Sequence, residues 1–371
     1  MSTSRGCWCG ERWRKRTAVD ADGSLLRDVA AYATDFLSRI DERSVAPKIT
    51  HDEVRRALDR PLTDDGVDAE TVVTELIDDA EDAVVGIAGS RYFGFVIGGS
   101  LPAALAADWI TSTWDQNAGL FACGGPATVA EDVAGRWLVD LLGLPRDASV
   151  AFTTGAMMAS FTGVLAARHH VLAAAGWDVA RHGLAGSPPI RVVVGRDRHA
   201  TIDRALRFAG IGTDAIVAID TGDAGAIRVD ALGAALSEAP GAPTIVCAQA
   251  GEVNTGAFDP LGAVCDVAHE AGAWVHVDGA FGLWAAASPS RRHLVAGAER
   301  ADSWVTDGHK WLNVPYDCGL AFCAHPASHR AALGVQAAYL VHSSDDGPRD
   351  PVDWTPEFSR RGRGIAVYAA L

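Results

Sequence analysis

Hydrophobic positions between residues 150 and 324 fall into short β-branched runs that alternate with stretches of helical periodicity. The runs cover residues 150–153, 190–195, 215–220, 244–250, 274–278, 303–307 and 320–324. The stretches between them that favour helices are 156–175, 201–210, 230–238 and 260–272. This alternation predicts an α/β domain with a mostly parallel, buried, seven-stranded sheet flanked by helices. Ligands of such folds bind at the carboxyl ends of the strands, so candidate chemistry is sought there.

The residues before this domain show a different pattern. Residues 1–23 are basic and lack periodicity, which predicts a disordered tail. Residues 25–40 and 69–85 have helical periodicity, and the polar stretch 41–68 between them predicts an extended connection. We expect residues 24–85 to form a helical arm, because they bury too little hydrophobic surface for a domain of their own. Two further helices are predicted over 101–114 and 130–142.

Composition narrows the classes of protein that the chain can represent. The 371 residues carry a net charge of −15, which argues against nucleic acid or an anionic membrane as the main partner. Polar residues interrupt every hydrophobic stretch before 18 residues, so no membrane span is expected. The basic N-terminus is followed by no apolar segment of a secretion signal, and the seven cysteines are odd in number. Reduced thiols and a cytoplasmic location are therefore expected. The spacing of Cys7 and Cys9 does not favour a metal site.

Lysine is rare in this chain. Only three of the 32 basic residues are lysines, namely Lys15, Lys48 and Lys310. A genome-wide preference for arginine codons explains the shortage. Lys310 is nevertheless the one candidate for chemistry that needs a primary amine in the main body of the chain.

Two segments at strand ends suggest binding of an anion and a ring. Gly155, Ala156 and Met157 lie between a predicted strand and a helix, where backbone N–H groups and the helix dipole attract a phosphate. Glycine is also common in ordinary turns of this kind. His199 lies at a similar junction, where it can cap the helix or stack on a planar cofactor.

Two further segments carry a carboxylate and an amine. Asp278 ends a predicted strand and can pair with a protonated ring nitrogen or cap the next element, while Ala280 is small enough for a flat ring to lie over it. Lys310 follows the strand 303–307 between hydrophobic residues, where it can form a Schiff base or extend its ammonium group into solvent. A phosphate cradle, a stacking histidine, a ring-nitrogen carboxylate and a Schiff-base lysine together are the set that holds pyridoxal phosphate.

The chain resembles the group II pyridoxal-phosphate-dependent amino-acid decarboxylases, the superfamily of the aromatic-amino-acid and glutamate decarboxylases. The resemblance runs from about residue 25 to the last residue, and its strongest segment is residues 309–319. Further matches are residues 91–95, 98–100, 137–145, 254–259 and 276–280. It implies fold type I, a homodimer, an L-amino acid as substrate, and decarboxylation to the corresponding amine.

The resemblance also implies roles for single residues. Lys310 is implied to form the Schiff base with the cofactor, Asp278 to keep the ring nitrogen protonated, and His199 to stack on the ring opposite Ala280. The phosphate contacts are implied to come from Ala156, Met157 and His309. The rest of the expected cofactor-binding set is Gly155, Asn254 and Asp307.

Several features depart from the family pattern. Met157 stands where Ser or Thr is usual, Asp307 where some members carry Asn, and Gly279 where Ala is more usual. A carboxylate beside a phosphate is repulsive unless it is neutralised or turned away. The expected mobile catalytic loop after Tyr339 lacks the tyrosine of many members, and Trp354 is the nearest aromatic residue.

The length is the largest departure. We expect residues 86–330 to form the cofactor-binding domain and residues 331–371 to hold the loop and the beginning of a truncated C-terminal domain. Two alternatives to decarboxylation remain. One is another pyridoxal phosphate reaction, namely transamination, aldehyde formation or carbon–carbon lysis. The other is an inactive truncated remnant.

Overall fold

The structure is a computed structural model that describes residues 23–335 and 349–371. The described chain divides into two compact units on either side of the Tyr92–Phe93 bond. The basic tail up to residue 22 and most of the expected mobile loop lie outside the described residues.

The first unit contains three helices, α1 (Ser24–Ser38), α2 (His51–Leu58) and α3 (Ala69–Ala80), followed by a short 3-10 helix, η1 (Glu81–Ala83). None of their residues is fully buried. The predicted extended connection over 41–68 is wrong where α2 forms. A capping box begins α2: the Thr50 hydroxyl accepts a hydrogen bond from the Glu53 N–H, and the Glu53 carboxylate accepts one from the Thr50 N–H. These bonds start a helix in a polar segment that has little hydrophobic periodicity.

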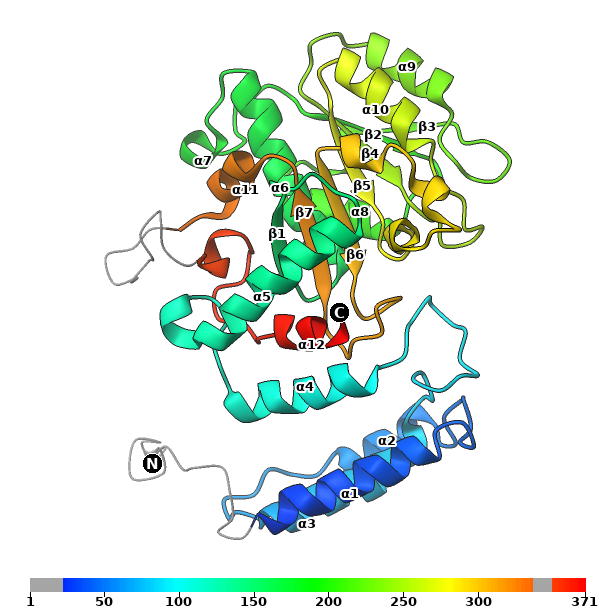
Figure 1. Ribbon diagram of the computed structural model, residues 1–371, viewed down its shortest axis with the longest axis vertical. Helices are drawn as coiled ribbons and strands as arrows, with labels where there is room; N and C mark the ends of the chain where they lie inside the picture. Colours follow the sequence, from blue (N-terminus) through cyan, green and yellow to red (C-terminus); the bar gives the residue numbers. More distant parts are fainter. Residues whose placement is uncertain (1–22, 336–348) are drawn as a thin grey trace, which may run out of the picture. The chain divides into compact units, whose positions relative to one another are not determined.

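The second unit is built around a seven-stranded sheet (Figure 1). Its strands are β1 (Ser149–Thr153), β2 (Arg191–Gly195), β3 (Ile216–Ile219), β4 (Thr244–Gln249), β5 (Trp274–Asp278), β6 (Ser303–Asp307) and β7 (Gly319–Cys323). They lie in the order β1-β7-β6-β5-β4-β2-β3. All neighbours pair in parallel except β7, which is antiparallel to both β1 and β6. The prediction of a mostly parallel, seven-stranded α/β sheet is confirmed.

Helices cover both faces of this sheet (Figure 1). The α-helices are α4 (Pro102–Trp114), α5 (Phe121–Leu141), α6 (Ala156–Ala174), α7 (Val179–His182), α8 (Ala200–Phe208), α9 (Val229–Ser237), α10 (Leu261–Glu270), α11 (Pro326–Leu333) and α12 (Gly364–Ala370). The 3-10 helices are η2 (Thr213–Ala215), η3 (Gly282–Ala287), η4 (Arg292–Val295), η5 (Ala298–Arg300) and η6 (Pro351–Asp353).

Alternation along each central strand divides the core in two. In β2, Val193 packs in one cluster with residues of α5, α9 and α10, while Val192 and Val194 pack in the other with residues of α6 and α8. Successive side chains of a strand point to opposite faces, so each central strand supplies both clusters. A sheet covered on both sides leaves its strand ends as the places where polar side chains can gather.

A buried ion pair ties the C-terminal segment to this core. Arg360 Nη1 lies 2.8 Å from Glu131 Oε2 of α5, and neither side chain is exposed beyond 1%. The same guanidinium donates hydrogen bonds to the carbonyls of Ala118 and Phe152. Residues 349–371 are thus part of the second unit although they follow the sheet in sequence. Within the two described ranges, no helix is long and apolar enough to cross a membrane.

Candidate active site

Most of the residues expected to carry chemistry lie where the parallel strands of the sheet have their carboxyl ends, a region called the sheet edge below. Asp278 and Asp307 end the parallel strands β5 and β6, and Thr153 ends β1, which runs in the same direction as β6. Gly319 begins β7 between Thr153 and Asp307, and a Cβ there would lie 2.2 Å from the carbonyl carbon of Gly155. Glycine at 319 therefore lets the start of α6 approach the end of β6.

The turn that carries Lys310 is fixed by a segment from far upstream. The Gly98 N–H donates to the His309 carbonyl at 3.2 Å, and the Gly99 N–H donates to Asn313 Oδ1 at 2.8 Å. A Cβ at Gly98 would lie 1.7 Å from the Lys310 carbonyl oxygen, so only glycine fits there. Asn313 itself adopts a left-handed φ of 54°. These contacts fix the backbone of the turn after β6 and therefore the position of Lys310.

Asp307 lies at the centre of the polar contacts at this edge. Its Oδ1 accepts a hydrogen bond from the Ala156 N–H at 2.6 Å, and its Oδ2 lies 3.3 Å from Lys310 Nζ. His309 Nε2 is 3.5 Å from Oδ1. Asp307 is only 3% exposed. A carboxylate thus occupies the N-terminus of α6 directly beside the lysine amine.

Burial changes the protonation of these groups. Burial raises the pKa of Asp307, and the nearby His309 and Lys310 only partly oppose the rise. Burial lowers the pKa of His309, which Asp307 in turn opposes. The imidazole is held in place because its Nδ1 accepts the Cys318 N–H at 3.2 Å and its ring stacks on Tyr316 at 4.2 Å between centroids. Burial therefore disfavours the charged forms of both side chains, and such a pair is typical of a site kept for a ligand.

Asp278 and Ala280 follow β5 on the neighbouring strand. Asp278 Oδ1 accepts a hydrogen bond from the Ala280 N–H at 3.2 Å, and the carboxylate remains partly exposed. The Ala280 carbonyl accepts the Asp307 N–H at 2.9 Å. The two strand ends are therefore joined, and both carboxylates lie on the same edge. The roles predicted for these residues stay predictions.

His199 is the N-cap of α8 and follows β2, which lies next to β4 on the side opposite β5. Its Nδ1 accepts a hydrogen bond from the Thr201 N–H at 3.3 Å, so it caps the helix as one of the two alternatives expected. Its backbone N–H donates to Oε1 of Gln249, the last residue of β4. The side chain is exposed, which leaves its ring available for stacking.

Asn254 and Met157 are less clearly placed. The Asn254 side chain is exposed and donates to Glu252 Oε1 at 2.6 Å, and none of its described bonds reaches the Lys310 turn. Met157 lies in the first turn of α6, where its backbone N–H is near the helix end but its side chain offers no hydroxyl. The structure thus brings together Gly155, Ala156, Asp307, His309 and Lys310, and it does not bring Asn254 to them through any described bond.

Three residues missed by the sequence analysis support the group. Lys310 Nζ lies 6.0 Å from the centroid of the Phe281 ring, Trp284 Nε1 donates to the Asp307 carbonyl at 3.0 Å, and Gln249 holds His199. Phe281 directly follows the segment 276–280 and Trp284 lies three residues further along, so their place just beyond a strand end was the signal available.

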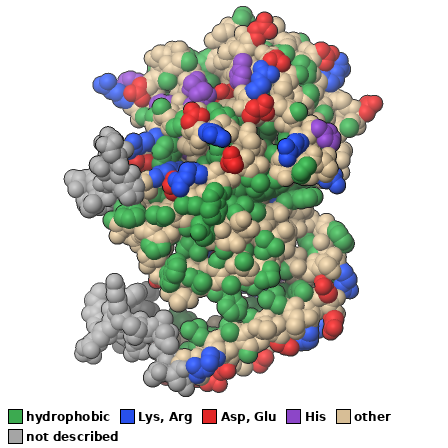
Figure 2. All heavy atoms as spheres, viewed as in Figure 1, with side chains coloured by type: hydrophobic (Ala, Val, Ile, Leu, Met, Phe, Trp, Pro, Cys, Tyr) green, Lys and Arg blue, Asp and Glu red, His purple; other side chains and the backbone are tan. Residues whose placement is uncertain are grey.

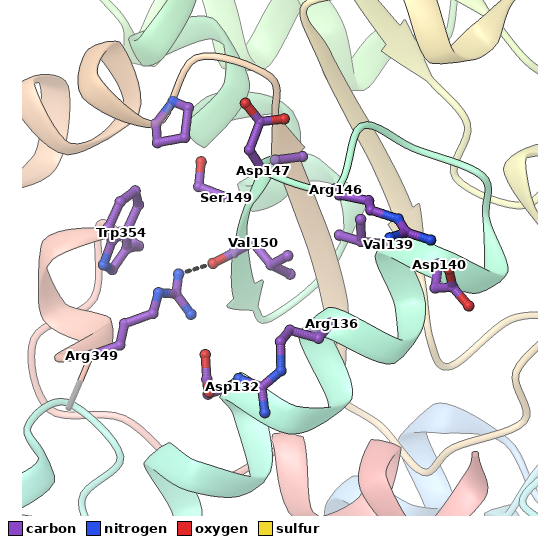
Figure 3. A pocket seen from close by; sticks show the side chains of 13 residues that line it. Asp132, Arg136, Val139, Asp140, Arg146, Asp147, Ser149, Val150, Arg349 and Trp354 are labelled. Atoms are coloured by element: carbon purple, nitrogen blue, oxygen red, sulfur yellow. Dashed lines mark hydrogen bonds and ion pairs between the residues drawn. The ribbon is translucent and has the colours of Figure 1, made fainter.

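A cavity of about 450 Å³ lies elsewhere, between α5, the start of β1 and the C-terminal segment (Figure 3). Arg349 and Trp354 line it, with Arg349 donating to the Val150 carbonyl and lying 4.8 Å from the Trp354 ring centroid. None of the predicted site residues lines this cavity. It is therefore distinct from the candidate active site.

The residues at the sheet edge fit pyridoxal phosphate. Oδ1 of Asp307 accepts the first N–H of α6, so this helix end already donates to an oxygen acceptor of the kind that a phosphate supplies. An amine and a second carboxylate, from Lys310 and Asp278, lie at the same edge. An anion site, an amine and a carboxylate on a doubly covered sheet define a pyridoxal-phosphate enzyme of fold type I.

Comparisons with known proteins give the family. The pyridoxal-dependent decarboxylase conserved domain matches residues 58–371. The chain belongs to this family, and it is a pyridoxal-phosphate-dependent carboxy-lyase, as the sequence resemblance implied.

Individual relatives are between about a quarter and three tenths identical to the chain. Tryptophan decarboxylase 1 of Oryza sativa subsp. japonica is 29% identical, over 98% of this chain and 73% of the relative. A phenylacetaldehyde synthase of a Rosa hybrid cultivar is 27% identical, over 92% of this chain and 69% of the relative. The crystal structure of Oryza sativa TDC with PLP and tryptamine superposes with a TM-score of 0.87 at 26% identity, covering 96% of this chain and 75% of that one.

Proposed function

We propose that the chain decarboxylates an L-amino acid to the corresponding amine. The observation that carries this proposal is the seating of Asp307 between the Ala156 N–H and Lys310 Nζ, at 2.6 and 3.3 Å. The N-terminus of α6 and a primary amine thus both contact the same carboxyl group, so they lie close enough to bind one ligand. Family membership and the decarboxylases among the relatives support the reaction type.

Each residue of the edge has a proposed task. Lys310 attaches the cofactor covalently and releases it to the substrate amine. Ala156, Gly155 and Met157 offer backbone N–H groups to the phosphate, beside His309 and Asp307. Asp278 keeps a proton on the ring nitrogen. When bound, pyridoxal phosphate takes up the electron pair released as the bond between Cα and the carboxylate breaks.

The remaining predicted residues hold the ring. We assign His199 to one face and Ala280 to the other, because they follow β2 and β5 on either side of β4. In this proposal Asn254 contacts the cofactor only after the hydrogen bond from its side-chain amide to Glu252 breaks.

Aldehyde formation is the second candidate. Two observations favour it: the chain has no tyrosine between His342 and Arg363, and a phenylacetaldehyde synthase is among the relatives. A group that returns a proton to Cα is needed for the amine product. Without it, dioxygen can act as the oxidant that takes up the two electrons, and hydrolysis then releases the aldehyde together with ammonia and hydrogen peroxide.

We also propose that the chain acts as a homodimer, in the cytoplasm. Large hydrophobic side chains gather on the face of the second unit that carries α4 and α5 (Figure 2). The exposed large hydrophobic residues of these two helices include Trp109, Ile110 and Trp114 of α4 and Phe121 and Trp137 of α5. An exposed hydrophobic patch on a single chain is typical of a subunit interface. Light scattering on the purified protein tests it: we expect twice the chain mass, and a monomer at micromolar concentration contradicts it.

We propose the domain limits that the sequence pattern predicts. Residues 24–85 form the arm, 86–330 the cofactor-binding domain, and 331–371 the loop with the segment that follows it. Limited proteolysis with mass spectrometry tests these limits, and a stable fragment that ends within β5 or β6 contradicts them.

Product analysis tests the reaction. The protein is incubated with pyridoxal phosphate and aromatic L-amino acids, and carbon dioxide, amine, aldehyde and keto acid are measured. Carbon dioxide with equal amine supports decarboxylation, and aldehyde without amine supports the second candidate. Lys310→Ala should lower the rate by about a thousandfold or more. Lys48→Ala, at the other lysine of the described residues, should leave it unchanged.

A further inference from the structure

Asp307 occupies the place that the proposed function gives to the cofactor phosphate. Its Oδ1 takes the N–H of Ala156, the first residue of α6, at 2.6 Å. Its backbone is held from both sides, since its N–H donates to the Ala280 carbonyl and its carbonyl accepts from Trp284 Nε1. Only the side-chain torsions are free to move. The Asp307 backbone therefore stays close to the helix end whatever binds there.

A phosphate at this helix end cannot lie beside an ionised Asp307 without a large cost. Two anions in contact in a buried site repel each other far more strongly than in water. The cations nearby are Lys310 and, when protonated, His309, both from the turn after β6. One lysine charge cannot balance both the Asp307 carboxylate and a phosphate that carries up to two negative charges.

Among the residues that the structure describes, the other elements in contact with Asp307 supply no further cation. From α6 the contact is the Ala156 N–H, and η3 contributes the Trp284 indole. Cys318, just before β7, faces Asp307 as a thiol, because burial raises its pKa. Asp307 is 3% exposed, so water does not screen the repulsion. A proton on Asp307 resolves the conflict, since a neutral carboxyl group can donate a hydrogen bond to a phosphate oxygen.

We propose that Asp307 is a proton-coupled gate for cofactor loading, an inference that rests on the proposed function of this site. Without cofactor, the ionised carboxylate occupies the start of α6 and pairs with Lys310. When the phosphate binds, Asp307 takes one proton from solvent and donates it in a hydrogen bond to the phosphate. Loading is therefore favoured at lower pH. Burial raises the pKa of Asp307 even before the phosphate arrives, which is the direction this gate requires.

Binding calorimetry with two probes isolates the phosphate. Pyridoxamine 5′-phosphate and pyridoxamine differ only in the phosphate, and neither carries the aldehyde that would bond to Lys310. Titrations at pH 8 in two buffers of different ionisation enthalpy count the protons taken up. For the wild type we expect about one more proton with the phosphate-bearing probe than with pyridoxamine. An equal count for the two probes overturns the gate.

Asp307→Asn assigns that proton to the residue. Asparagine has the same shape and donates to the phosphate without a proton. We expect the additional proton to disappear and the affinity for pyridoxamine 5′-phosphate at pH 8 to rise on the order of tenfold. Its affinity for pyridoxamine should not change. An unchanged proton count, or weaker binding of the phosphate-bearing probe by a variant with wild-type circular dichroism, overturns the gate.

The same data separate this proposal from the proposed function. Correct proton counts in a protein that yields no carbon dioxide support the gate and contradict the decarboxylation. Full decarboxylation with equal proton counts does the reverse. Absence of binding by the wild type overturns both.

Discussion

The two ends of strand β6 carry the same residue type in opposite electrostatic states. Asp302 comes directly before the strand, and its carboxylate accepts hydrogen bonds from the Val275 N–H at 2.7 Å, His325 at 2.7 Å and His269 at 3.0 Å. Burial pushes its pKa upward, but these bonds outweigh it and lower the pKa. Asp307 ends the strand, and burial raises its pKa because its partners compensate less.

The difference shows how one strand separates stability from chemistry. At the amino end, three donors from β5, α10 and the segment after β7 stabilise a carboxylate whose only visible task is to hold those elements together. At the carboxyl end, a carboxylate with one backbone donor and a 3.3 Å contact to Lys310 remains under-compensated. Groups in that state lie where a ligand completes the set.

The largest difference between the two ends of β6 should appear in protein stability when each carboxylate is removed. We expect Asp302→Ala to lower the free energy of unfolding by about 3 kcal/mol, because it leaves a backbone N–H and two imidazoles without their acceptor. Asp307→Ala should cost less than about 1 kcal/mol, because it also removes the cost of burying a charge. Urea unfolding of the cofactor-free proteins measures both. Equal losses would show that the two ends do not differ.

The pH dependence of stability should have opposite signs at the two ends. The lowered pKa of Asp302 gives a contribution that is complete above the ordinary value near 3.8 and is lost as pH falls through the folded-state pKa. The raised pKa of Asp307 gives a contribution that is complete below 3.8 and is lost as pH rises through the folded-state pKa.

Asparagine variants at the two positions separate these contributions. The wild type should lose its advantage over Asp302→Asn on acidification below about pH 4, by on the order of 1 kcal/mol. Against Asp307→Asn it should lose stability as pH rises above that value. Unfolding free energies of the cofactor-free proteins across this range measure both, and slopes of the same sign contradict the comparison.

A substitution with a smaller expected effect tests the carboxyl end of β6 alone. Met157→Ser introduces the hydroxyl that the first turn of α6 lacks, and we expect it to tighten pyridoxamine 5′-phosphate binding by about three- to tenfold. Met158→Ser, one residue further along α6, is the matched control and should not tighten it. Binding by Met157→Ser no tighter than by the wild type would mean that a hydroxyl at this position does not reach the phosphate.

The strand pattern was predictable because it is local. The limits of β5 and β6 coincide with the predicted runs, since continuous hydrophobic residues end there at a carboxylate. Helix α5 begins at Phe121 rather than at 130, with a kink at the non-helical Gly124. Gly124 and Pro126 act as stop signals in a sequence, so the turn before them was not predicted.

The pairing at the site was not predictable in this way. Asp307 and Ala156 are 151 residues apart, and no local pattern encodes their hydrogen bond. The sequence predicts that an aspartate beside a phosphate needs neutralising, but it does not predict that the Asp307 carboxylate takes the helix end itself. The antiparallel insertion of β7 between β1 and β6, which makes that contact possible, likewise depends on strand order rather than on periodicity.

Covalent attachment of the cofactor at Lys310 is the most direct test of the central claim. The protein is loaded with pyridoxal phosphate, reduced with borohydride, digested and mapped by mass spectrometry. We expect one cofactor per chain on the peptide that contains Lys310, retained in Lys48→Ala and lost in Lys310→Ala. Labelling of Lys15 or Lys48 with an unmodified Lys310 would contradict the assignment of this site.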